Sequence, residues 1–90
     1  MAKTFNTALE ARDTITEMRR DLNKLPYNAD LHRLCGNIDR MVDELSKLEV
    51  YTRRTPPRSR YHIEYNKQRD AIRGAMKHLD NLILMLRLMA

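Results

Sequence analysis

Apolar residues recur every three or four positions in the first part of the chain, which is the spacing of one face of an α-helix. Thr7, followed by Glu10 three positions later, has the form of a capping box, so we expect a helix to begin near residue 7. Pro26 lacks a backbone donor and disfavours helical geometry at the residue before it, so this helix should end at residue 25. Its apolar stripe is Ala8, Ala11, Ile15, Met18, Leu22 and Leu25.

A second helix is predicted over residues 29–49, after a short turn at 26–28. Asn28 or Asp30 can cap its first amides. Because only a few residues separate the two helices, we expect them to form an antiparallel hairpin. The apolar stripe of the second helix is Leu31, Leu34, Ile38, Met41, Leu45 and Leu48, widened on one side by Cys35 and Val42.

Residues 50–58 interrupt the pattern, because Thr55-Pro56-Pro57 cannot continue a helix. Ser59 is a candidate N-cap for a third helix over residues 59–89, which at ~1.5 Å per residue would be roughly 45 Å long. The first two helices would each span about 30 Å. The pattern therefore predicts an all-α, single-domain fold over residues 1–90, a three-helix bundle whose long C-terminal helix lacks cover at one end. The seam of that helix is Tyr65, Gln68, Ile72, Ala75, Leu79, Leu82, Leu86 and Met89.

Composition narrows the class of protein. With 42% apolar and 32% charged residues among 90, the chain is unlike a disordered protein. Its one cysteine, Cys35, cannot form an intramolecular disulfide, which fits a reducing compartment, and no secretory leader opens the sequence. The most apolar run, residues 82–89, contains Arg87 and is far shorter than the roughly 20 residues of a membrane span. We therefore expect a cytoplasmic protein without membrane association.

Charge is concentrated in one segment. Residues 53–77 hold eight basic and two acidic residues, whereas residues 1–52 hold eight and nine. A concentrated positive charge indicates an anionic partner, nucleic acid or a phosphorylated small molecule such as a nucleotide, with arginines neutralising phosphates and tyrosines stacking on bases. The alternatives are a solvated turn, or contact with the acidic stripe at Glu10, Asp13, Glu17 and Asp21 of a neighbouring subunit. The candidate anion-binding residues are Arg53, Arg54, Arg58, Arg60, Tyr61, Tyr65, Arg69 and Arg73.

The C-terminal helix is apolar on nearly all sides from Leu82 onward. A three-helix bundle covers only one stripe of each helix, so an exposed patch of this kind indicates an interface. It would be occupied by a second copy, giving a homo-oligomer, or by a partner protein, unless the first two helices cover it. The candidate interface residues are Met76, Ile83, Met85, Leu88 and Met89.

Binding is favoured over catalysis. His32 and Cys35 supply only two metal ligands, so no metal, cofactor or catalytic residue is expected. The sequence thus predicts a non-enzymatic, self-associating helical binding or regulatory protein, with a protein-directed inhibitor or adaptor as the alternative. Arg73 and His78 have the arginine–four residues–histidine spacing that resembles HEPN-type ribonucleases, an all-helical family. That resemblance implies RNA cleavage, and it is the remote alternative because Gly74 stands where that family commonly has a polar residue.

Overall fold

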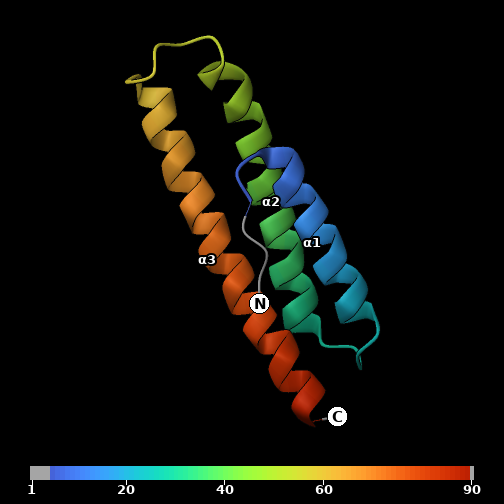
Figure 1. Ribbon diagram of the computed structural model, residues 1–90. Helices are drawn as coiled ribbons and strands as arrows, with labels where there is room; N and C mark the ends of the chain where they lie inside the picture. Colours follow the sequence, from blue (N-terminus) through green and yellow to red (C-terminus); the bar gives the residue numbers. More distant parts are fainter. Residues whose placement is uncertain (1–4, 90) are drawn as a thin grey trace.

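A computed structural model describes residues 5–89, which form three α-helices and no strand. These are α1 (Ala8–Asn23), α2 (Ala29–Thr52) and α3 (Arg60–Met89). Each helix runs antiparallel to the one before it, and the molecule is a rod of 50 × 18 × 17 Å (Figure 1). The all-α, three-helix prediction is confirmed.

The helix ends follow local hydrogen bonding. The Thr7 hydroxyl oxygen accepts from the backbone N–H of Glu10 at 3.2 Å, as predicted, and the Glu10 carboxylate accepts from the backbone N–H of Asn6. The Asn28 side chain accepts from the N–H groups of two residues in the first turn of α2. α2 continues to Thr52 rather than ending at 49, because nothing before Pro56 prevents helical geometry.

The core follows the predicted stripe of α1, but the buried lines of α2 and α3 are rotated. In α2, Cys35 and Val42 are buried, whereas the predicted stripe members Leu34, Met41 and Leu48 are only half-buried. In α3 the most buried side chains are those of Ile72, Met76, Leu79 and Ile83. Ala75 and Leu82, predicted for the seam, are only partly buried. The reason is that α3 must face both α2 and α1, so its buried line lies between the stripes that each neighbour would select alone. The expectation that Met76 and Ile83 lie at an exposed interface is therefore corrected: both belong to the core of the single chain.

The unequal helix lengths leave two ends of the rod incomplete. α1 has 16 residues, α2 has 24 and α3 has 30. Beyond the start of α1, the end of α2 and the beginning of α3 project as a two-helix hairpin (upper end of Figure 1). At the start of α1, Phe5 is fully buried against the core and extends the cover by about one turn. None of the described helices is long and apolar enough to cross a membrane.

Two leucines of α1 test this account of the core. Leu22 is 1% exposed and Leu9 is 69% exposed. Leu22→Ala should lower the free energy of unfolding by about 2–5 kcal/mol, because it removes buried apolar atoms and leaves a cavity. Leu9→Ala is the matched control, and should change it by less than about 0.5 kcal/mol. Chemical denaturation followed by circular dichroism measures both. Equal losses from the two substitutions would contradict the assigned orientation of α1.

Candidate functional site

The projecting hairpin, residues 50–64, carries the four arginines predicted for the basic turn, and we call it the basic arm. It contains one acidic residue, Glu64, so its net charge is +3 out of +5 for the whole chain. Arg53 forms an ion pair with Glu49 at 3.1 Å, with its own side chain 74% exposed. Arg54, Arg58 and Arg60 are exposed and form no ion pair within residues 5–89. Three guanidinium groups of the arm are therefore open to an external anion.

The turn between α2 and α3 is held by its own hydrogen bonds. The backbone N–H of Ser59 donates to the Pro56 carbonyl at 3.0 Å, and the Ser59 hydroxyl donates to the Thr55 hydroxyl oxygen at 3.0 Å. The Thr55 carbonyl lies 3.3 Å from the His62 ring nitrogen Nε2. Ser59 thus directly precedes α3, as predicted. Its hydroxyl, however, forms a hydrogen bond within the turn, to Thr55, instead of capping an α3 amide.

Two tyrosines cover one side of the basic arm. The rings of Tyr51 and Tyr61 stack with centroids 5.3 Å apart and planes inclined by 16°. Both side chains are exposed. Because each ring covers one face of the other, only the outer faces remain open to a ligand. Tyr61 therefore stays a candidate for stacking, while Tyr51, which was not among the predicted site residues, shares its surface.

Tyr65, Arg69 and Arg73 do not join the arginines of the arm. The Nε of Arg73 donates to the Phe5 carbonyl at 3.0 Å, and its Nη2 donates to the same oxygen and to Asn6 Oδ1. The Tyr65 hydroxyl lies 2.9 Å from the Asn6 carbonyl and 3.0 Å from Glu49 Oε2, so its hydrogen is shared between two acceptors. The Arg69 guanidinium lies over the Tyr65 ring. Tyr65 and Arg73 thus bind the segment before α1, with Arg69 packed on Tyr65, in an arrangement that we call the N-terminal clasp.

Glu49 is the centre of this clasp, and sequence reasoning missed it. Its carboxylate accepts from the backbone N–H of Ala8 at 2.9 Å, from the Tyr65 hydroxyl and from Arg53. Burial, and then the hydrogen bond to the Glu49 carboxylate, raise the pKa of Tyr65 to about 12. A glutamate near the end of a helix gives no sign in the sequence that it caps a helix whose first residue lies 41 positions away. Only its place in the fold reveals that function.

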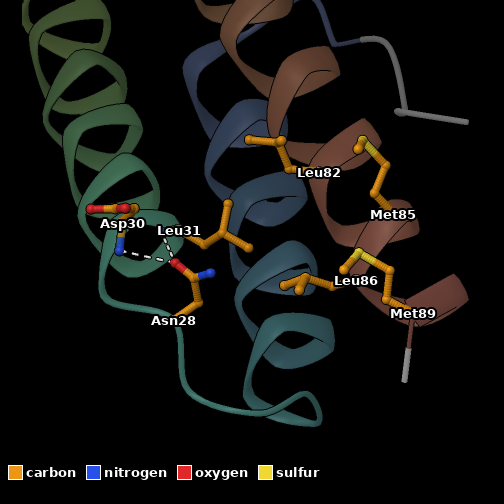
Figure 2. Close-up of a pocket in the computed structure, with 7 residues that line it drawn as sticks. All are labelled: Asn28, Asp30, Leu31, Leu82, Met85, Leu86 and Met89. Carbon is orange, nitrogen blue, oxygen red and sulfur yellow. Dashed lines mark hydrogen bonds between the residues drawn. The ribbon is translucent and has the colours of Figure 1, made fainter.

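The C-terminal part of α3 presents a second surface. Leu84, Met85, Leu88 and Met89 are exposed, and we call them the apolar end of α3. Beside it lies a groove of about 280 Å³ between α3 and the start of α2. Figure 2 shows Leu82 and Leu86 directed across this groove toward Leu31. Its lining is Asn28, Asp30, Leu31, Leu82, Met85, Leu86 and Met89.

The residues considered for metal binding and catalysis do not come together in the described part of the chain. Within residues 5–89, no group of three or more histidine, cysteine or carboxylate side chains could hold a metal ion. Cys35 is buried, and the His32 ring stacks on Tyr27 with centroids 4.9 Å apart. The Arg73 guanidinium, which carried the resemblance to HEPN-type ribonucleases, is bound to the Phe5 carbonyl. His78 is exposed on another side of α3, about 140° around the helix.

Comparisons with protein-family models, with curated proteins and with solved structures gave no match for this chain. Inferences about function therefore depend on the surfaces described above.

The raised pKa of Tyr65 predicts a pH dependence of stability. Because the folded-state pKa, about 12, exceeds the ordinary value of 10.0, the native state holds this proton more tightly than the unfolded chain. The resulting stabilisation is complete below pH 10 and is lost as the pH rises to about 12. The difference in unfolding free energy between the wild type and Tyr65→Phe should shrink over that interval. Urea denaturation at several pH values measures it, and a constant difference would contradict the Glu49–Tyr65 hydrogen bond.

Proposed function

We propose that the protein is a non-enzymatic helical binding protein whose basic arm contacts the phosphates of nucleic acid. The observation that carries this proposal is the set of three exposed guanidinium groups, Arg54, Arg58 and Arg60, without an acidic partner in the described chain. Guanidinium groups form bidentate hydrogen bonds with phosphate, and each phosphate contact releases counterions from the nucleic acid. The exposed Tyr51–Tyr61 pair beside them offers an aromatic face to an unpaired base.

The shape of the arm favours a polymer over a free nucleotide. The hollow beside the turn, of about 370 Å³, is lined by Leu48, Arg60, Tyr61 and Glu64. Its carboxylate would repel a phosphate placed inside. The two glycines of the chain, Gly36 and Gly74, lie within helices and form no phosphate-binding loop. The three exposed arginines instead lie on both sides of the turn, an arrangement that suits successive phosphates of a polymer.

Self-association is the second part of the proposal. The apolar end of α3 exposes Leu88 and Met89 by about four fifths of their surface, 79% and 80%. An apolar cluster of this kind is stabilised when another molecule covers it.

The same observation favours a second candidate function, in which the protein is an adaptor or inhibitor that binds a target protein with this surface. In that case the arginines would only accelerate the encounter.

The arm hypothesis predicts a salt-dependent affinity that depends on particular arginines. Replacing Arg54, Arg58 and Arg60 together by glutamine should weaken binding to a short fluorescent DNA duplex or RNA strand. For the duplex, the slope of log K against log salt concentration should fall in magnitude by about 2.7, at about 0.9 for each lost phosphate contact. Fluorescence anisotropy at several salt concentrations measures both quantities.

A control variant with the same loss of charge separates this site from a general effect of basicity. Arg20, Lys24 and Arg40 are exposed and lie outside the arm. Their joint replacement by glutamine should reduce the slope much less. Equal effects of the two triple variants, or binding that does not respond to salt, would contradict the proposed contact surface.

A further inference from the structure

The side of the molecule that faces away from α1 contains three hollows in one row between α2 and α3. Ion pairs mark the opposite side: Arg12–Asp43 and Arg87–Asp21 join α1 to α2 and to α3. Met41 lies two positions before Asp43 on α2, and Met85 lies two positions before Arg87 on α3. Each methionine is therefore about 160° around its helix from the ion-paired residue, on the side away from α1. Both line hollows, of about 200 and 280 Å³ respectively, and Leu48 lines the third. We call this side the open face.

The open face carries two stripes with heptad spacing. On α2 the half-buried Leu34, Met41 and Leu48 are seven residues apart, and on α3 Gln68, Ala75 and Leu82 repeat the same interval. A heptad stripe is the pattern by which a helix contacts another helix along its length. Within one chain the apolar members of these stripes pack at the edge of the core and are only partly buried, so both stripes remain partly open to solvent.

We propose that a second copy of this chain covers the open face in an antiparallel orientation. α2 then packs against α2 of the second copy, and α3 against its α3, around a twofold axis near residues 38 and 74. This inference rests on the self-association proposed above and specifies its surface, its partner and its geometry. The result is a four-helix core with one α1 on each outer side.

The area of the face supports a dimer that uses its whole length. A stable, specific interface buries about 800 Å² on each partner. A face 50 Å long and 18 Å wide has a footprint of roughly 900 Å², which is comparable with that requirement.

Charges along α2 specify the antiparallel orientation. α2 carries two ion pairs, Asp30 with Arg33 and Glu44 with Lys47, that lie fourteen positions apart. In each pair the acidic residue comes first and the basic residue follows three positions later. Asp30 and Glu44 line hollows of the open face. When α2 is reversed about its centre, Asp30 comes opposite Lys47 of the second copy, and Arg33 comes opposite Glu44. These side chains are 64–89% exposed in the single chain and are therefore accessible.

The basic arms and the centre of α3 agree with this orientation. With the copies antiparallel, the two arms lie at opposite ends, whereas a parallel pair would bring two +3 charges together. At the centre of α3, Ala71, Gly74 and Ala75 are small. A Cβ added to Gly74 would meet nothing within 4 Å, so the packing of the single chain does not require a glycine there. A second helix that approached α3 closely at this point would require a residue as small as glycine.

Cysteine cross-linking tests the orientation. Glu64 and Met85 are exposed and line hollows at opposite ends of the open face. In the antiparallel dimer residue 64 faces residue 85 of the second copy, while each is about 30 Å from its own counterpart. In a Cys35→Ala background, Glu64→Cys and Met85→Cys should form a disulfide-linked dimer when mixed, and little when each is alone. Asp13→Cys, on the outer side of α1, is the control and should not cross-link.

A second variant tests the surface without disturbing the core. Ala71 is exposed and lines the central hollow. Ala71→Arg should raise the dimer dissociation constant at least tenfold, while Thr16→Arg on the exposed side of α1 should leave it unchanged. Light scattering over a range of concentrations measures the mass, and circular dichroism verifies that both variants keep their helices.

The outcomes separate this inference from the proposals before it. A wild-type protein that stays monomeric at all concentrations would overturn both the dimer and the proposed self-association, and would leave the open face to a foreign helix. A dimer that survives Ala71→Arg, or that cross-links through like positions, would overturn only the surface or orientation inferred here. Nucleic-acid binding is measured separately, on the arm variants. Because Arg60 also lines a hollow of the open face, the mass of the arm variant is measured as well.

Discussion

Three helices can bury apolar surface only over the length that all three share, and in this protein α1 sets that length. It has 16 residues, against 24 in α2 and 30 in α3. Within the shared stretch lie the fully buried side chains of the core, such as Ile15, Ile38 and Leu79. Outside it, α2 and α3 have only each other at one end, and α3 continues to an exposed apolar end at the other (Figure 1). Both candidate surfaces thus arise from the same mismatch in length.

The N-terminal clasp limits the effect of this mismatch at the arm end. Phe5 fills the space that another turn of α1 would occupy, and polar side chains of α2 and α3 satisfy the backbone groups around it. Glu49 serves both helices at once, because it caps α1 and holds the base of α3 through Tyr65. The buried polar groups stabilise the junction only while all of their partners are present. The base of the arm is therefore fixed, although its tip lacks a third helix.

Periodicity was sufficient to predict the helices, and it was insufficient to place the side chains of α3. The stripe of α1 followed from its spacing, whereas in α2 the core took Cys35 and Val42 in preference to Met41. Thr7 and Asn28 cap where their residue types indicated. α3 is apolar on several sides near its end, so spacing alone could not choose between Ala75 and Met76, or between Leu82 and Ile83. The position of α1 makes that choice. Likewise, Arg73 resembles the other arginines in sequence, and only the fold brings the Phe5 carbonyl within its reach.

The two-helix construction of the arm also affects how it would respond to a ligand. Regions with few buried apolar contacts open locally at a lower free energy than the core does. Val50, Tyr51, Tyr61 and Ile63 are all exposed, so the arm beyond the clasp has little buried surface to keep its helix ends closed. A phosphate backbone that bridged the arginines on both sides of the turn would slow the hydrogen exchange of these amides. Part of the binding free energy would then be spent on ordering the arm, and the affinity would report its flexibility as well as its charge.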